Sequence, residues 1–220
     1  DSAYETAISL YQKGINIEAI VDNREKIDSK LINVTEKNNI KVYKGYTVVD
    51  TSGYKRINRI SIMQLSKDGQ KVVGSKISIA CDCLGISGGW TPAVHLFTQS
   101  GGKLRFRDED QVFIPNIYPS DQISLGSCNG DFTLDEILSS IPNKLKDFLN
   151  INGTDYENLE VHSSFNKSKR NIWLLPSDKV IGKTKPFVDY QNDATAKDIK
   201  LALREGFRSI EHVKRYTTTG

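Results

Sequence analysis

The order of helix-like and strand-like segments at the start of the chain constrains the fold most. Residues 3–11 place apolar side chains on one helix face, and residues 15–21 have the apolar pattern of a strand that ends at Asp22. The sequence predicts a second helix over 29–37 and a short strand over 40–43. A helix–strand–helix–strand order of this kind is typical of α/β proteins.

Three strand-like runs follow, over 46–51, 56–65 and 76–80. The dipeptide Asp68-Gly69 lies between the second and third runs and favours a tight hairpin turn. We therefore expect a small antiparallel meander after the α/β segment.

Residues 79–84 are predicted to form a buried strand that enters a Gly88-Gly89 turn, and Pro92 blocks its continuation. Cys81 and Cys83 are two residues apart on this strand and would share one face as small core residues. A metal site would need further ligands, and the sequence has no second Cys pair and no His pair. We therefore predict no metal site.

A second glycine turn, at 126–130, follows a predicted strand over 122–125 and precedes a helix predicted over 134–140. Small residues let the backbone approach a pyrophosphate, and the N–H groups at a helix start attract negative charge. Ligands also bind at strand ends in open α/β sheets. Two interpretations stay open here, a nucleotide-binding turn and an ordinary strand-to-helix turn.

The remaining third of the chain divides in two. Residues 142–186 have prolines and polar clusters, which predicts a connector that lies over a surface. Residues 195–198, Thr-Ala-Lys-Asp, resemble a capping box that opens a helix reaching Glu205. Gly206 would end this helix, and Ser209 would begin a second short one.

Composition excludes several classes of function. The 30 basic and 27 acidic residues give a net charge of +3, so the sequence indicates neither a nucleic-acid nor a membrane partner. Three cysteines are too few for a disulfide scaffold, which favours a cytoplasmic location. Both ends look cut within elements, so we expect a fragment of a longer protein.

Asp22 and the histidines are the other candidates for chemistry. Asp22 follows a strand where a ribose-binding acid would lie, but Asp-Ser-Ala-Tyr at 1–4 stands where a glycine fingerprint should precede it. We therefore expect Asp22 to cap a loop. His95 is predicted to be a packed core residue, and His212 to lie near a helix C-terminus. His162 is isolated in sequence, and we assign no catalytic residue.

Two tracts resemble a known family. The first is 81–92, from Cys-Asp-Cys to Trp-Thr-Pro, continued by His-Leu-Phe at 95–97 and by 99–104. The second runs from Phe187 to Gly220 and contains Asp-Tyr-Gln-Asn-Asp-Ala-Thr-Ala-Lys-Asp. Both are similar to the alpha subunits of heterotetrameric sarcosine oxidases, flavoproteins built from two nested dinucleotide-binding domains. The resemblance implies part of an α/β, Rossmann-like FAD/NAD(P)-binding fold with a small C-terminal helical module.

The resemblance also implies a function. Such enzymes oxidatively demethylate sarcosine to glycine and pass electrons through FAD and FMN to oxygen. The beta subunit holds the amine-oxidising FAD and the covalent FMN, while the alpha subunit holds NAD and, in its C-terminal domain, tetrahydrofolate. The other partners are the gamma and delta subunits. The region present here would bind NAD and support assembly. Its cofactor-binding residues would be Gly126, Ser127, Cys128, Asn129, Gly130, Phe132 and Leu134.

Four segments follow from this resemblance. Residues 1–80 would be an inner nucleotide-binding-like domain with the meander, and 81–141 the returning half of an outer domain. Residues 142–186 would be the connector, and 187–220 a helical module like a degenerate [2Fe–2S] domain. Relatives with a cluster have Cys-x-Cys at the start of this module, whereas this chain has Asp189 and Gln191. Because iron–sulfur ligation needs thiolates, we expect no cluster.

Two other functions compete with this one. An NAD(P)H-dependent disulfide-reductase-like flavoprotein would need a redox Cys pair four or five residues apart beside a glycine fingerprint, and the sequence has neither. A cofactor-free structural interaction domain would keep the fold and bind no nucleotide. Titration with NAD separates the latter from the first hypothesis.

Overall fold

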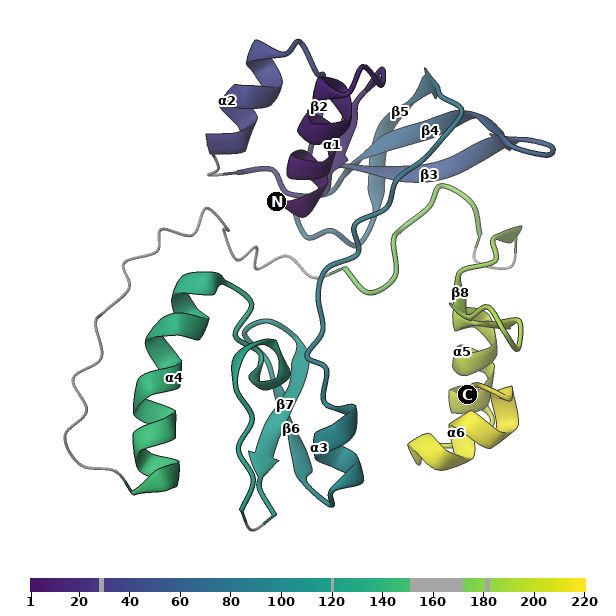
Figure 1. The fold of residues 1–220 in the computed structure, drawn as a ribbon. Coiled ribbons are helices and arrows are strands. Elements are labelled where there is room, and N and C mark those ends of the chain that lie inside the picture. Colours follow the sequence, from purple (N-terminus) through teal and green to yellow (C-terminus); the bar gives the residue numbers. More distant parts are fainter. Residues whose placement is uncertain (28–29, 120, 151–171, 181–182) are drawn as a thin grey trace. The chain divides into compact units, whose positions relative to one another are not determined.

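A computed structural model of the chain describes residues 1–27, 30–119, 121–150, 172–180 and 183–220 (Figure 1). The first half contains α1 (Ser2–Gln12), β1 (Ile20–Asp22), α2 (Lys30–Lys37), β2 (Val42–Lys44), β3 (Tyr46–Gly53), β4 (Ile57–Leu65) and β5 (Val72–Ala80). The second half contains α3 (His95–Gln99), β6 (Lys103–Arg107), β7 (Val112–Ile117), the 3₁₀ turn η1 (Gly126–Asn129), α4 (Leu134–Leu149), β8 (Phe187–Asp189), β9 (Ala194–Thr195), α5 (Ala196–Arg204) and α6 (Ile210–Thr217).

The predicted α/β class is confirmed, and the mixture of helices and small sheets is consistent with a dinucleotide-binding fold. Strand β1 pairs with β2, β6 with β7, and β8 with β9. The chain divides into two compact units, one formed by the described parts of 1–20, 27–41 and 85–171 and the other by those of 21–26, 42–84 and 172–220. The four predicted segments stay a prediction.

The predicted meander is present as the antiparallel sheet β3–β4–β5. Its central strand carries the core of the second unit, with Ile62 fully buried and Leu65 only 2% exposed. Strict alternation would place Met63 on the opposite face from Ile62, yet both are buried. The buried face of β4 therefore changes between Ile62 and Met63, and the β4–β5 register has an irregularity at the same place, between Ile62 and Gln64.

The N-terminal helices form as the apolar pattern predicts. In α1, Tyr4, Ala7 and Ile8 are buried and lie on one face. Gly14 follows with a φ of 82°, and its N–H donates to the Tyr11 carbonyl, as expected for a glycine that ends a helix. The first strand is shorter than predicted, since β1 begins at Ile20.

Helix α4 is longer than predicted. The predicted helix ends near residue 140 and is followed by a connector from 142, whereas α4 continues to Leu149 with Pro142 inside it. Proline removes one backbone donor, but Ile137, Ile141 and Leu145 continue the four-residue apolar spacing across it. The helix therefore continues through the proline although one backbone donor is missing. The rest of the predicted connector, 151–171, lies outside the described residues.

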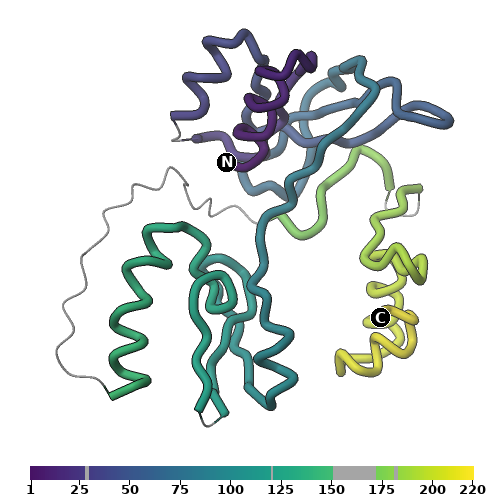
Figure 2. The backbone as a smooth tube through the Cα atoms, viewed as in Figure 1, coloured from purple at the N-terminus to yellow at the C-terminus, as the bar shows by residue number. Residues whose placement is uncertain are grey.

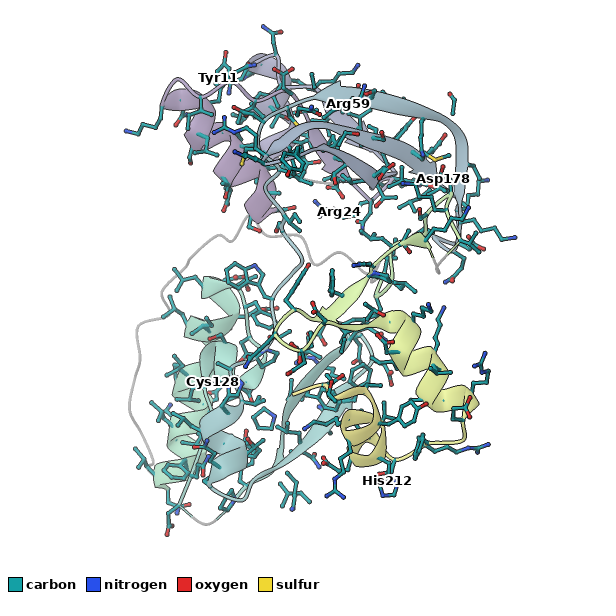
Figure 3. All side chains as sticks on the ribbon, turned by 90° about the vertical axis from the view of Figure 1, so that its right-hand side faces the viewer. Tyr11, Arg24, Arg59, Cys128, Asp178 and His212 are labelled. Carbon is teal, nitrogen blue, oxygen red and sulfur yellow. The ribbon has the colours of Figure 1, made fainter. Side chains whose placement is uncertain are left out.

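The segment 172–180, called the strap below, is held to the three-stranded sheet by two ion pairs. Asp178 pairs with Lys76 of β5 at 2.7 Å, and Lys179 pairs with Asp50 of β3 at 2.7 Å. Since β3 and β5 are the outer strands, two adjacent strap residues of opposite charge bridge both edges of the sheet. Figure 3 labels Asp178 beside this sheet.

The ion pairs shift the pKa values of both acids. The Lys179 ammonium lowers the pKa of Asp50 below its ordinary 3.8, and Lys76 lowers that of Asp178 in the same way. Because a depressed pKa stabilises the folded state above the ordinary value, this attachment is complete above about pH 4. It is lost as the pH falls through the lowered pKa values.

The strap gives a first prediction. Lys76→Glu replaces attraction of Asp178 by repulsion, so the strap should detach and trypsin should cleave after Lys179 faster than in the unchanged chain. The double change Lys76→Glu with Asp178→Lys restores the opposite charges and should restore resistance of the bond after Lys179, which mass spectrometry separates from cleavage at the new lysine.

The matched control is Lys55→Glu, an exposed lysine in the turn between β3 and β4. It makes the same charge change outside the ion pairs and should leave cleavage unchanged. Equal cleavage rates in Lys76→Glu and the unchanged chain would show that the ion pairs do not hold the strap.

Candidate functional site

The predicted glycine turn is present, but the strand before it is not. Residues 126–129 form the 3₁₀ turn η1, and Gly126 and Gly130 have φ angles of 62° and 82°. Residues 122–125, all described, form no strand. Strand β7 has its partner in β6, and the chain then turns at Asp121 with φ 59°. The predicted strand is therefore wrong, because no strand among the described residues pairs with 122–125.

Gly130 is a packing glycine. A Cβ atom here would lie 2.8 Å from Arg107 Nη2 and 2.9 Å from Ile114 Cγ2, and its φ of 82° is one that side chains rarely adopt. Arg107 Nη2 also donates to the Gly130 carbonyl oxygen at 2.8 Å. Gly130 thus lets the turn approach the β6–β7 hairpin closely, which Figure 2 shows as a tight curl of the backbone beside these strands.

Arg107 is itself fixed by Asp110. The guanidinium Nε donates to Asp110 Oδ1 at 2.7 Å, and Nη2 contacts the other carboxylate oxygen. This pairing raises the pKa of Arg107 above its ordinary value, so the guanidinium stays charged. A charged donor to a partly buried carbonyl is stronger than a neutral one, and it sets the position of Gly130.

Asn129 and Asp131 connect the turn to α4. The Tyr118 hydroxyl donates to Asn129 Oδ1 at 3.2 Å, and Asn129 Nδ2 donates to Asp131 Oδ2 at 3.3 Å. The same Asp131 oxygen accepts from Lys144 Nζ at 3.1 Å and from Ser140 Oγ at 3.4 Å. These contacts use the side-chain oxygen and nitrogen of Asn129 and one carboxylate oxygen of Asp131, so their visible role is structural.

The outward surface of the turn has a different character. Ser127 and Cys128 are exposed, and Leu134 at the start of α4 is 55% exposed, while Phe132 is half-buried. Figure 3 labels Cys128 on this turn. Of the seven predicted cofactor-binding residues, the accessible ones are therefore Ser127, Cys128 and Leu134, whereas Gly126 and Gly130 are buried.

Thr133, the N-cap residue of α4, is not among the predicted site residues. Its side chain is 7% exposed, and its hydroxyl oxygen has no hydrogen-bond partner among the described residues. Thr133 followed three residues later by Glu136 matches the Ser/Thr-x-x-Glu pattern of a helix start, and that pattern would have identified it. Asp135 and Glu136 in the first turn offset the positive end of the α4 dipole.

The other candidates from the sequence have local roles. The Asp22 carboxylate accepts from the Arg24 N–H at 2.9 Å and from its guanidinium Nη2 at 2.8 Å, so the predicted loop cap is confirmed. Figure 3 labels Arg24. Cys81 and Cys83 follow β5 rather than lying on a buried strand, and Cys83 is exposed. The prediction of a shared core face was wrong because β5 ends at Ala80.

The two histidine predictions were also wrong. His95 is exposed at the first position of α3, where Phe97 rather than His95 is the buried residue. His212 lies in the first turn of α6, not near its C-terminus, and is exposed. Figure 3 labels it. His162 lies outside the described residues. Within the described ranges, no group of three or more His, Cys, Asp or Glu side chains is placed to hold a metal ion, and no helix is long and apolar enough to cross a membrane.

The start of the C-terminal module contains Asp189, one of the two residues that replace the expected thiolates. Its carboxylate accepts from Asn192 Nδ2 at 2.7 Å and from the Gly220 N–H at 3.1 Å. The Asn192 amide and the Gly220 N–H lower the pKa of Asp189 to about 2. The helix that follows begins with the predicted capping box, in which Asp198 Oδ2 accepts from the Thr195 N–H at 2.8 Å.

The packing of Gly130 gives a second prediction. Gly130→Ala places a methyl group against Arg107 and Ile114 in a left-handed backbone conformation. We expect it to lower the free energy of unfolding by roughly 1–3 kcal/mol, measured by urea denaturation. Any loss of nucleotide binding in this variant would then follow from misfolding of the turn.

Gly89→Ala is the matched control for Gly130→Ala. Gly89 also has a positive φ, of 101°, but its added Cβ would meet no described atom within 4 Å. Gly89→Ala also puts a side chain on a residue with positive φ, but the added methyl group meets no neighbouring atom. It should therefore lower the free energy of unfolding less than Gly130→Ala does. An equal decrease in the free energy of unfolding in both variants would mean that the contact with Arg107 and Ile114 does not contribute to stability.

Comparisons with known proteins show which proteins this chain is similar to. Residues 183–220 match the Sarcosine oxidase A3 domain. The sarcosine oxidase subunit alpha of Corynebacterium sp. (strain P-1) is 28% identical over 227 residues, covering 99% of this chain and 23% of that protein. The corresponding subunit of Rhizobium meliloti (strain 1021) is 28% identical over 231 residues, covering 100% of this chain and 21% of that protein.

A third alpha subunit, from Corynebacterium sp. (strain U-96), is 27% identical over 99% of this chain. Among solved structures, an L-proline dehydrogenase from P.horikoshii aligns with 91% of this chain and 40% of its own, with a TM-score of 0.49 and 17% identity. The chain spans less than a quarter of the length of the curated relatives it matches. Along nearly its whole length, the chain is similar in sequence to these three sarcosine oxidase alpha subunits.

Proposed function

We propose that this chain is a region of the alpha subunit of a sarcosine oxidase, an amine oxidoreductase that demethylates sarcosine to glycine with oxygen as acceptor. The observation that carries the proposal is the similarity of nearly the whole chain to three such subunits. The match of 183–220 to the A3 domain supports it independently of the first tract. The region acts in binding and assembly, with the beta, gamma and delta subunits as partners in the cytoplasm.

NAD is the cofactor that we assign to this region. Bound NAD would supply a nicotinamide that accepts hydride and a pyrophosphate that needs hydrogen-bond donors. Ser127 and Cys128 are exposed on the turn, so their hydroxyl, thiol and backbone are accessible to such a ligand. Gly126 has a φ of 62°, which brings the backbone into the tight turn that precedes them.

The charges near the turn decide where the pyrophosphate would lie. Asp135 and Glu136 already place two carboxylates in the first turn of α4, which disfavours an anion there. The pyrophosphate would therefore lie along Ser127 and Cys128, and the adjacent ribose hydroxyls would suit the acidic first turn. Leu134, exposed at the helix start, would contact the cofactor through its apolar side chain.

The assigned position of NAD gives a third prediction. Ser127→Glu in the intact alpha subunit adds a negative charge beside the pyrophosphate and should weaken NAD binding roughly tenfold or more in calorimetric titrations. The matched control is Ser139→Glu, the same change at an exposed position on α4. Equal affinity in all three proteins would place NAD elsewhere. An intact subunit without measurable affinity would favour the cofactor-free interaction domain.

The subunit assignment gives a fourth prediction. The intact alpha subunit, co-expressed with beta, gamma and delta subunits of a sarcosine oxidase, should copurify with them and give sarcosine-dependent peroxide. The 220-residue chain alone should give none above a buffer blank, since we assign no catalytic residue to it. Peroxide formation by the chain alone would refute the proposed division of roles.

The disulfide-reductase alternative gains no support from the geometry. Cys81, Cys83 and Cys128 form no disulfide with one another in the described part of the chain. The first two are only two residues apart in an extended segment after β5, and the third lies on the η1 turn. A redox disulfide needs a pair with Cα atoms less than about 7 Å apart and a hydride donor beside it.

A further inference from the structure

Asp189 lies at the end of β8 and accepts four hydrogen bonds. Its Oδ1 accepts from the backbone N–H groups of Gln191 at 2.8 Å and Asn192 at 3.3 Å. Its Oδ2 accepts from Asn192 Nδ2 at 2.7 Å and from the Gly220 N–H at 3.1 Å. All four donors are neutral amides. Three belong to the loop between β8 and β9, and the fourth is 31 residues further along the chain.

The segment 217–220, which provides the fourth donor to Asp189, has a strained backbone. Helix α6 ends at Thr217, and Thr218 follows in the left-handed conformation with a φ of 56°. A β-branched residue rarely adopts this conformation, so surrounding contacts must hold it. The Thr217 hydroxyl donates to the Val213 carbonyl at 2.7 Å and lies 2.8 Å from the Thr219 hydroxyl, and Gly220 then reaches Asp189.

The two ends enclose both helices of the C-terminal module. The loop at 190–193 leads through β9 into α5, and α5 is followed by α6, which leads back to Gly220. A contact between the loop and Gly220 therefore closes a ring of chain around the α5–α6 pair. The core of that pair is small, with Ala202 and Val213 as its buried apolar residues within the described helices. Because this module buries so little apolar area, its stability depends more on the hydrogen bonds that join its two ends.

We propose that the Asp189 carboxylate is the structural clamp that closes the C-terminal module, by tying the 190–193 loop to the segment 218–220. A carboxylate suits this role because its two oxygens offer about four acceptor positions, all of which are used here. An asparagine side chain has only one acceptor oxygen, so it can accept hydrogen bonds from at most two of the four N–H donors. This inference does not depend on NAD binding or on the subunit assignment.

The test compares amide hydrogen exchange, followed by NMR, in the 220-residue chain and in Asp189→Asn. We expect exchange at Gln191, Asn192 and Gly220 to become roughly tenfold faster in the variant, because each amide loses a charged acceptor. The amides of β3–β5 should keep their rates, which shows that the chain is still folded. Asp189→Glu keeps the charge and both oxygens and should recover part of the protection at Gly220.

Asp193→Asn is the matched control for Asp189→Asn. It makes the same charge change in the same loop, at a residue whose φ is 54°, a conformation that asparagine adopts readily. Exchange at Gly220 should not change in this variant. Unchanged exchange at Gly220 in Asp189→Asn would overturn the proposal. So would an equal acceleration at the amides of β3–β5, because Asp189 would then support the whole chain rather than this clamp.

Discussion

The hydrogen bond from Arg107 to the Gly130 carbonyl determines the geometry of the candidate site. Arg107 lies at the end of β6 and is fixed by Asp110, so the hairpin provides a rigid charged donor for a turn more than twenty residues away. The turn can lie this close to the hairpin only because residue 130 has no side chain, since a Cβ would overlap the guanidinium. The direction of α4, which begins four residues later, then depends on this contact. The exposed positions of Ser127 and Cys128 therefore depend on how Gly130 packs against the hairpin.

This dependence changes how a glycine turn is interpreted. Gly130 was predicted to leave room for a cofactor, and the structure shows that Arg107 and Ile114 occupy that room. The two interpretations that the sequence left open are therefore not exclusive. One side of the turn is structural packing, and the other is an exposed surface where NAD is proposed to bind. Substitutions on the packed side should change stability, whereas substitutions of Ser127 on the exposed side should change the affinity for NAD.

Local signals in the sequence predicted local structure well. The hairpin at Asp68-Gly69, the capping box at Thr195 and Asp198, and the helix start after Ser209 depend on contacts within a few residues, and all three are present. The failures concern partners that are distant in sequence. The polar–apolar alternation at 122–125 is typical of a strand, but this segment pairs with no strand in the described part of the chain, and no periodicity reveals that. The Arg107–Gly130 contact and the strap ion pairs were likewise invisible, because nothing in a linear pattern shows which charges meet.

The oxygen chemistry of the Asp189 clamp has a consequence for the C-terminal module. A thiolate ligand or an iron atom changes its bonding when it is oxidised, and a module closed by such groups depends on metal supply and redox potential. A carboxylate has no oxidation state to change, and its four donors are amides that are equally inert. The closure of the module around α5 and α6 is therefore independent of the redox state of its surroundings. In the sarcosine oxidase proposed above, such a module would hold its shape in the presence of the peroxide that the proposed reaction releases.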